Sequence, residues 1–426
     1  MPVWLWLVLA LIVLYWVLPE FALHYLHIGV VARPRVVEDC LCLTFDDGPG
    51  EASAEVLDAL RDHGAKATFF VVGGRAAARP ELVRRAAAEG HEIASHGARH
   101  RSAWLLTPWG TFAQLIRGRR SIEAVSGAAV RFMRPPWGHM NAAMPLAAAG
   151  ASQRLALWSY DPGDWRAAQD PQELARRIVD HAAPGQIYLL HDAGGDGRRH
   201  TARALEIALP KLQELGYAAV TLSELLAKEE PIGFGRQVLQ AIWGVWELGF
   251  ERLNRIQRIG DVRSLLRIGR VTYRGLPVTL KSGREVKPGD RVGELHFRNP
   301  QMAALGALRA MARVERTMRD LALLIEADPR YRDLEVFFGI SVVFRGPRRW
   351  GFEIQDMQFT RWRRFVAGSY LRWVMSVYHP QGLERLQHRR EMLEPKGIFI
   401  TREEILKRFG PGAAKAARVS RPDEEG

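Results

Sequence analysis

Short apolar runs alternate with amphipathic stretches over the first half of the chain. Seven runs have the length of buried strands, and they fall near 40–45, 67–72, 91–95, 130–133, 155–160, 186–191 and 218–221. Between them, apolar residues recur at helical spacing in 53–63, 80–89, 111–125, 171–181 and 201–215. Glycines follow four of these helical stretches, as helix stop signals do. Alternation of strands and helices predicts a parallel sheet with right-handed crossovers.

The alternation stops near residue 230, and a different pattern follows. A Trp-rich amphipathic stretch predicts a helix over 234–259, and 302–325 and 361–377 predict two more. Strand patterns occupy 271–280 and 291–297, and a hairpin is expected from 337–344 and 349–354 around an Arg-Gly-Pro turn. We expect a small α+β domain over 231–410. The tail 411–426 is rich in Ala, Pro and charge, and is expected to be disordered.

Length and charge agree with two domains. The chain has 426 residues, 60 Lys and Arg and 47 Asp and Glu, with a net charge of +13. Residues 231–426 hold 36 of the basic and 22 of the acidic residues, so the excess lies in the second half. Arg clusters at 345–349 and 361–364 have two interpretations. They are solvated surface, or they bind an anionic lipid or wall polymer.

The N-terminus is apolar enough to enter a membrane. Residues 3–18 carry no charge, and this stretch is slightly shorter than the about 20 residues that span a bilayer. Extension to residue 28 would cover the distance and place Glu20, His24 and His27 at an interface. A basic segment ahead of it and a clear small-residue cleavage site are missing. We expect residues 1–35 to be an uncleaved transmembrane helix and linker, which argues against nucleic acid as a partner.

The first candidate catalytic and metal-binding residues lie in the segment Thr-Phe-Asp-Asp-Gly-Pro at 44–49. Asp46 and Asp47 sit on a turn that directly follows an apolar strand. Two adjacent carboxylates there are costly unless one meets a cation or takes up a proton. One could bind a metal while its neighbour acts as a base. His96 and His100 are separated by three residues, so one helical turn would bring both imidazoles to the same ion as Asp47.

Three further segments follow in order: Arg-Pro-Pro-Trp-Gly at 134–138, Asp-Pro-Gly-Asp-Trp at 161–165 and Leu-Leu-His at 189–191. With these, the chain resembles the polysaccharide deacetylase family with a NodB-type domain, carbohydrate esterase family 4. The resemblance covers residues 38–226 and rests on five ordered motifs. It implies a deacetylase domain over 36–230, followed by a module of unknown function.

The resemblance also implies roles for individual residues. The catalytic residues would be Asp46 as base, Arg134 orienting that base, His191 as general acid and Asp164 supporting His191. The metal ligands would be Asp47, His96 and His100. Substrate contacts would come from Trp137, Trp165 and Leu189, the last lining an acetyl pocket. Two positions depart from the usual family pattern, since Gly97 replaces a Ser or Thr and Trp137 replaces a Tyr.

The motifs indicate where on the fold the chemistry lies. Five of the seven strand ends carry a motif, and the carboxyl ends of parallel strands are where barrel enzymes place their sites. A complete eight-stranded barrel takes about 250 residues, and this region is shorter. The fold class expected is α/β, a distorted seven-stranded (β/α) barrel, with a basic C-terminal α+β domain and an N-terminal transmembrane helix.

The expected function is metal-dependent hydrolysis of acetyl groups from N-acetylated amino sugars in a cell-surface polysaccharide, such as peptidoglycan or a chitin-like glycan. Alternatives are an O-acetyl or lipid-linked sugar substrate, or a wall- or membrane-binding protein without turnover. Zinc is the first choice for a His-rich site, although cobalt and manganese also fit.

Two signals bear on the compartment. Substrates of the family lie outside the cell, so we expect a single-pass membrane protein with an extracytoplasmic catalytic domain. Arg33 and Arg35 follow the apolar span, and the positive-inside rule favours the opposite orientation. Cys40 and Cys42 are two residues apart on one strand, a poor geometry for a disulfide, and we expect free thiols.

Overall fold

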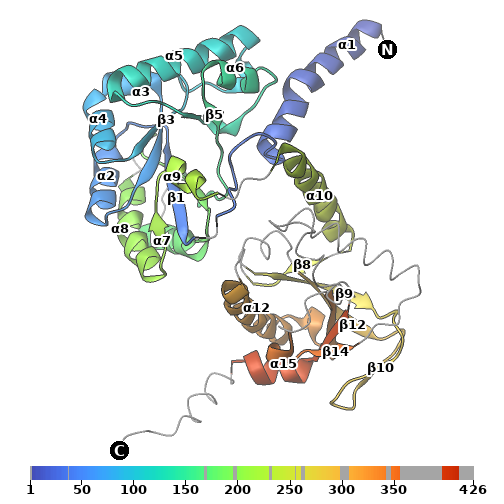
Figure 1. The fold of residues 1–426 in the computed structure, drawn as a ribbon. Helices are drawn as coiled ribbons and strands as arrows, with labels where there is room; N and C mark the ends of the chain where they lie inside the picture. Colours follow the sequence, from blue (N-terminus) through green and yellow to red (C-terminus); the bar gives the residue numbers. More distant parts are fainter. Residues whose placement is uncertain are drawn as a thin grey trace, which may run out of the picture. The chain divides into compact units, whose positions relative to one another are not determined.

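The computed structural model divides into two compact units, Met1–Ala241 and Ile242–Gly426 (Figure 1). It describes residues 2–36, 38–166, 170–194, 199–229, 233–254, 256–260, 264–297, 307–341, 347–355 and 396–411. The predicted helix at 361–377 and nearly all of the predicted disordered tail lie outside the described residues.

The first unit is built on one parallel sheet. Its strands are β1 (Cys40–Asp46), β2 (Ala67–Val71), β3 (Glu92–Ser95), β4 (Phe132–Met133), β5 (Arg154–Leu155), β6 (Ile187–His191) and β7 (Ala218–Ala219). The order is β5-β4-β3-β2-β1-β6, with β7 paired to the start of β1, and every pair is parallel. The predicted parallel α/β sheet is therefore confirmed.

The sheet curls, so that its two ends approach each other. An isolated parallel bridge joins Tyr160, which follows β5, to Tyr188 of β6. The backbone N–H of Leu189 also donates to the carbonyl of Tyr160 at 2.9 Å. The sheet is thus a curled half-barrel, and its closure into the expected distorted seven-stranded barrel stays a prediction.

Helices surround this sheet (Figure 1). They are α2 (Ser53–Asp62), α3 (Gly73–Ala78), α4 (Pro80–Ala88), α5 (Pro108–Ser126), α6 (Met144–Gly150), α7 (Pro171–Asp180), α8 (Arg199–Glu214) and α9 (Leu222–Ala227). Five of them match the predicted helices. The other three, α3, α6 and α9, were not predicted, because six or seven residues are too few to show a clear helical period.

The core explains why β1 reads as an unbroken apolar run. All seven of its residues are buried, as in a central strand covered on both faces. Leu41, Leu43 and Phe45 join one cluster with residues of α2 and α8, whereas Cys40 and Cys42 join another. Both cysteines are free thiols, as predicted, and burial raises the pKa of Cys42 to about 12.

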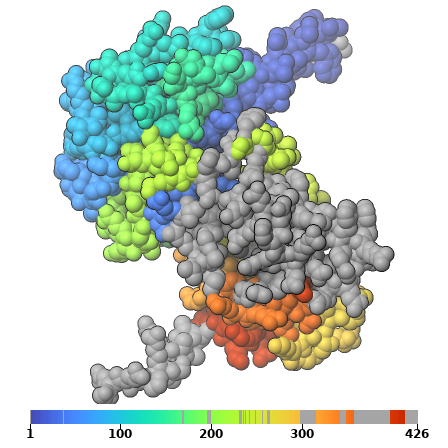
Figure 2. All heavy atoms as spheres, viewed as in Figure 1, coloured from blue at the N-terminus to red at the C-terminus, as the bar shows by residue number. Residues whose placement is uncertain are grey.

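The apolar N-terminus forms a continuous helical segment, with α1 (Val3–Ile12), η1 (Val13–Val17) and η2 (Glu20–Tyr25). Val3–Tyr25 is long and apolar enough to cross a membrane, a criterion that a signal sequence also meets. Its first part stands out from the body of the first unit, in dark blue in Figure 2.

The second unit holds a mixed sheet. Its strands are β8 (Gln257–Arg258), β9 (Leu266–Thr272), β12 (Arg291–Phe297), β13 (Val336–Ser341), β14 (Glu353–Gln355) and β15 (Lys396–Thr401), in the order β14-β15-β13-β12-β9-β8. A small ribbon pairs β10 (Val278–Thr279) with β11 (Glu285–Val286). Helices α12 (Ala307–Ala327) and α15 (Arg402–Phe409) contribute to the core under the sheet. Helix α10 (Phe234–Leu253) precedes β8 in the chain. Two short 3-10 helices, η6 (Pro329–Tyr331) and η7 (Pro347–Trp350), precede β13 and β14.

Two strand predictions in this unit were wrong. The predicted strand at 271–280 is the end of β9 followed by β10, with Gly275 and Pro277 between them. The predicted hairpin is absent from the described residues, since β14 pairs with β15 and β15 pairs with β13. A strand from much later in the chain separates the two, which local turn chemistry could not reveal.

Candidate active site

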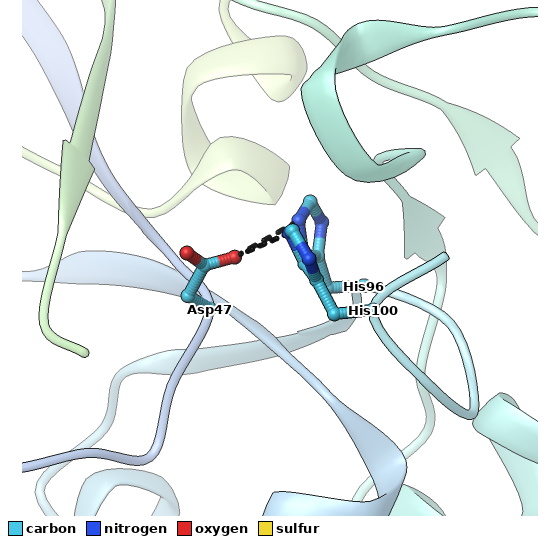
Figure 3. Close-up of side chains that lie close together, drawn as sticks. All are labelled: Asp47, His96 and His100. Atoms are coloured by element: carbon cyan, nitrogen blue, oxygen red, sulfur yellow. Dashed lines mark ion pairs between the residues drawn. The ribbon is translucent and has the colours of Figure 1, made fainter. Parts of the chain in front are cut away.

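The three predicted metal ligands lie together at the carboxyl ends of β1 and β3. Asp47 Oδ1 is 2.9 Å from His100 Nε2 and 3.4 Å from His96 Nε2 (Figure 3). One ligand atom from each residue lies within 4.8 Å of the others. Two imidazole nitrogens and a carboxylate oxygen at this spacing suit a divalent transition metal.

The loop that holds the two histidines differs from the prediction. Residues 96–100 form an irregular loop after β3, not a helical turn. Gly97 has φ +85°, a left-handed conformation that a continued helix does not allow, and a Cβ there would lie 3.1 Å from Gln114 Nε2. The Gly in place of a Ser or Thr therefore suits a strained, crowded position.

Helix α5 braces this loop, a contribution that sequence reasoning missed. The carbonyl of Gln114 accepts from the N–H of Ala98 at 3.0 Å, and the Gln114 side-chain amide donates to the carbonyl of Arg99. The loop is thus held to α5 at two successive residues, Ala98 and Arg99. A glutamine inside a helical pattern gives no sign of such a role.

His96 is oriented for metal binding by its second nitrogen. Its Nδ1 lies 2.7 Å from the carbonyl oxygen of Arg134. A carbonyl only accepts, so Nδ1 carries the proton and Nε2, facing Asp47, keeps its lone pair. Metal-bound histidines are commonly held in this way. The donor set and its orientation therefore fit a divalent cation.

The surroundings of Asp47 also favour its ionised form, which is the form that binds a metal. Burial by itself would raise the pKa of Asp47, but the adjacent imidazoles of His100 and His96 outweigh burial and hold this pKa well below its usual range. The carboxylate therefore stays ionised over the physiological range of pH.

Asp46 lies beside this group and is held by Arg134. Asp46 Oδ1 accepts from Arg134 Nη1 at 2.7 Å, and both side chains are buried. Asp46 Oδ2 is 4.0 Å from His96 Nδ1. The guanidinium also donates to Thr44 Oγ1 and to the carbonyl of Leu157, each at 2.7 Å. One oxygen of Asp46 is thereby fixed, and Thr44 is a further supporting residue that the sequence did not reveal.

His191 forms the second proton-transfer group. Its Nδ1 lies 2.8 Å from Asp164 Oδ1, and its backbone N–H donates to Asp164 Oδ2 at 2.8 Å. Burial by itself would lower the pKa of His191, but the hydrogen bond and charge of Asp164 outweigh it, with help from Asp46 and Asp47, and raise it. His191 therefore favours the imidazolium more than an ordinary histidine does.

Two residues at the start of α8 complete the surroundings of Asp164. Thr201 Oγ1 donates to Asp164 Oδ2 at 3.0 Å, and His200 Nε2 lies 2.7 Å from the Asp164 carbonyl. Sequence reasoning gave neither a role, because they lie in no motif and reach Asp164 only through the packing of α8.

The three predicted substrate-binding residues have different surroundings. Trp137, in η4 (Pro136–Gly138), is 55% exposed, and its ring centroid lies 4.3 Å from that of His100. Trp165 is also exposed, and its Nε1 donates to Asp161 Oδ2 at 3.0 Å. Leu189 is buried on β6, two residues before His191, so both side chains share one face of that strand.

The comparisons with known proteins identify the family of the first domain. Residues 34–155 match the polysaccharide deacetylase family. A peptidoglycan-N-acetylglucosamine deacetylase of Bacillus cereus is 38% identical over 192 residues, covering 44% of this chain and 89% of the relative. The chain belongs to the polysaccharide deacetylase family.

Other members of the family match a similar share of this chain. A chitooligosaccharide deacetylase of Bradyrhizobium is 35% identical, covering 43% of this chain and 89% of that protein. The solved structure of peptidoglycan deacetylase PdaC from Bacillus subtilis is 31% identical and has a TM-score of 0.41, covering 45% of this chain and 91% of that one. Residues 236–409 match a second family, the YkoP domain. The predicted resemblance is thus confirmed for the first domain, and a distinct module follows it.

Proposed function

We propose that this protein is a metal-dependent deacetylase that hydrolyses N-acetyl groups of amino sugars in a cell-surface polysaccharide. The observation that carries the proposal is the position of two proton-transfer groups around the metal ligands. Asp46 and His191 are register partners at the ends of adjacent parallel strands β1 and β6. Asp47, next to Asp46, faces His96 and His100. A base, an acid and a ligand set therefore share one edge of the sheet.

Amide hydrolysis needs a nucleophile from water and a proton for the departing nitrogen. Arg134 fixes one oxygen of Asp46, and this carboxylate takes the proton of the attacking water. His191, held as an imidazolium by Asp164, gives a proton to the leaving amine. Arg134 and Asp164 are positioning residues, since each acts through the group that it holds.

Asp47, His96 and His100 would hold the metal. When bound, a divalent cation supplies Lewis acidity, which acidifies water and polarises the acetyl carbonyl. Zinc is the metal we propose, because two imidazoles and one carboxylate with open positions are a frequent catalytic zinc set.

The substrate class follows from the relatives and from one exposed ring. The relatives act on N-acetylglucosamine of peptidoglycan and on chitooligosaccharides, as their names state. Trp137, exposed beside His100, offers an aromatic face on which a sugar can stack. We propose Leu189 as part of the acetyl pocket and Trp165 as a further substrate contact.

We further propose that Val3–Tyr25 anchors the protein in the cell membrane, with the catalytic domain outside. The domain limits proposed are 1–35, 36–230, 231–410 and 411–426. Arg348 and Arg349, exposed in η7, remain candidates for contact with anionic lipid or wall polymer. Salt-sensitive co-sedimentation with anionic liposomes would support such contact, and absence of binding at low salt would indicate that the arginines are solvated surface.

The function is tested by acetate release from an N-acetylglucosamine oligomer and from isolated peptidoglycan, using the zinc-loaded full chain. Asp46→Asn should lower release by about 10²–10⁴-fold, whereas Asp62→Asn, which changes an exposed carboxylate on α2, should leave it unchanged. Release from neither substrate by a zinc-bound protein would contradict N-deacetylation. An O-acetyl or lipid-linked sugar, or a role without turnover, would then be the better hypothesis.

A further inference from the structure

The second half of the N-terminal helix packs against the catalytic domain. The Tyr15 hydroxyl donates to the carbonyl of Leu106 at 3.1 Å, and the carbonyl of Tyr15 accepts from the N–H of Ala142 at 2.9 Å. Trp16 Nε1 donates to the carbonyl of Trp104 at 3.0 Å. The helix therefore contacts the loops that follow the metal ligand His100 and the Arg-Pro-Pro-Trp-Gly segment.

Polar contacts extend this packing to the end of the helix. Glu20 Oε2 accepts from Trp104 Nε1 at 3.0 Å and from the backbone N–H of Met140 at 2.6 Å. His24 Nδ1 lies 2.7 Å from the carbonyl oxygen of Gly138. Glu20 and His24 thus face the domain, and the polar side of the helix is used for docking.

Docking leaves too little free helix to cross a bilayer. None of residues 3–14 is buried, and the hydrogen bonds to the domain described above begin at Tyr15. Twelve helical residues at 1.5 Å each cover about 18 Å, whereas the hydrocarbon core is about 30 Å thick. A docked helix can reach across only if the docked half, and the protein surface beside it, also enters the bilayer.

The outward surface at this place suits lipid. On the docked half of the helix, Val17, Leu18, Phe21 and Tyr25 fall on one face and are 47–66% exposed. In the adjacent loop and at the start of α5, Trp104 is 45%, Leu105 84% and Trp109 82% exposed. These seven residues are named here the interfacial surface. None of them carries a charge, and large exposed apolar sets of this kind mark interaction sites.

We propose that the interfacial surface lies in the headgroup and outer acyl region of the membrane that holds the helix. The inference rests on the membrane anchor proposed above. Continuity with the apolar span, the shortfall in its length and the aromatic composition favour lipid over a protein partner. Trp and Tyr concentrate at the interface of bilayers because their rings are amphipathic.

The site then opens close to the bilayer surface. The Trp104 ring stacks on His139 at 3.9 Å, His139 lies 5.9 Å from Trp137, and Trp137 lies 4.3 Å from the metal ligand His100. Three ring contacts thus connect the interfacial surface to the ligand set. The substrate class that this geometry favours is an acetylated glycan at the membrane surface, attached to lipid or newly formed there.

Quenching of a fluorescent label by nitroxide lipids tests the surface directly. The full chain is reconstituted in liposomes with a single environment-sensitive label at Leu105→Cys, at Val8→Cys or at Leu215→Cys. Cys40 and Cys42 are buried and do not compete for the label. Val8 reports the span, and the exposed Leu215, after α8 at the opposite end of the strands, is the matched control.

We expect lipid nitroxides to quench the labels at 8 and 105 at least twofold, with little effect at 215. Quenching at 8 without quenching at 105 would overturn the interfacial surface and leave the anchor intact. A label at 105 that is blue-shifted but not quenched would indicate cover by protein, and would also overturn it. Absence of quenching at 8 would remove the anchor itself. None of these readouts depends on deacetylase activity.

Discussion

Asp46 and Arg134 form a buried ion pair, with 2.7 Å between Asp46 Oδ1 and Arg134 Nη1 and no exposed surface on the arginine side chain. The arginine is also packed on Phe70, with its guanidinium carbon 4.0 Å from the ring centroid. A charge placed this deep is tolerated because its partner and two further acceptors are in place. The position of the proposed base, Asp46, therefore depends on an arginine that follows β4, three strands away from β1 in the sheet.

Replacing the arginine should destabilise the domain as well as the site. Arg134→Met leaves Asp46 buried without its partner, and breaking such a pair costs about 3–5 kcal/mol of unfolding free energy. Thermal unfolding at pH 7 measures the loss. Arg176→Met, at an exposed ion pair on α7, is the control and should not shift the midpoint measurably. Equal effects of the two changes would contradict a special role for Arg134.

The two adjacent aspartates should separate metal binding from chemistry. Asp47→Asn removes an anionic ligand, and we expect zinc affinity to fall more than the about 10–100-fold typical of changes around a ligand. Asp46→Asn should keep zinc affinity within a few-fold and lose about 10²–10⁴-fold in kcat. Competition with a chromogenic chelator gives the affinity, and acetate release gives kcat. Loss of zinc by both variants would show that the division of roles is wrong.

The activity should fall as pH rises through the pKa of His191. The imidazolium is the acid, and its pKa lies above the ordinary 6.5 because the hydrogen bond and charge of Asp164 outweigh burial. Asp164→Asn removes that support, so the alkaline limb of the kcat profile should move to lower pH. The variant should lose more activity at pH 8 than at pH 6.

The same shift links folding to pH. A raised pKa of His191 stabilises the fold fully below the unfolded-state pKa, and this contribution is lost as pH rises through the folded-state pKa.

Thr201→Val removes one hydrogen bond to Asp164 but keeps the charge of Asp164. It should move the alkaline limb less than Asp164→Asn does. An alkaline limb unchanged in Asp164→Asn would exclude His191 as the group that it reports.

A glycine on α5 should control the shape of the metal loop. A Cβ at Gly118 would lie 2.6 Å from the carbonyl carbon of Gly97 and 2.7 Å from the N of Ala98, both backbone atoms. Gly118→Ala should therefore lower zinc affinity and stability, although Ala favours a helix by about 1 kcal/mol. Zinc titration and thermal unfolding measure both effects.

Gly74→Ala on α3 is the matched control, because its Cβ would lie 3.6 Å from the carbonyl oxygen of Ala98, an ordinary contact. This variant should bind zinc normally and be as stable as the wild type or slightly more stable. A Gly118→Ala protein that behaves in the same way would show that the close approach of α5 is not required.

Local sequence patterns were enough to predict most of the secondary structure of the first unit. The fully buried β1, the glycine stops after helices and the strand–helix alternation predicted a parallel sheet whose strand ends carry the chemistry, because burial and turn chemistry are written in neighbouring residues. They failed at the His96–His100 loop, where spacing suggested a helical turn and the left-handed Gly97 breaks it. They also failed where β15 separates β14 from β13, because strand order depends on distant partners.

The sequence by itself determined which residues carry charge, ligand atoms and apolar surface, and that five motifs follow in order along one domain. Only the tertiary structure decided which of them meet. Arg134 follows β4, which is three strands away from β1 in the sheet, and yet it binds Asp46 at the end of β1. Thr201 reaches Asp164 from α8. It also turned Glu20 and His24 toward the domain. Such contacts depend on the packing of elements far apart in the chain, which no local spacing encodes.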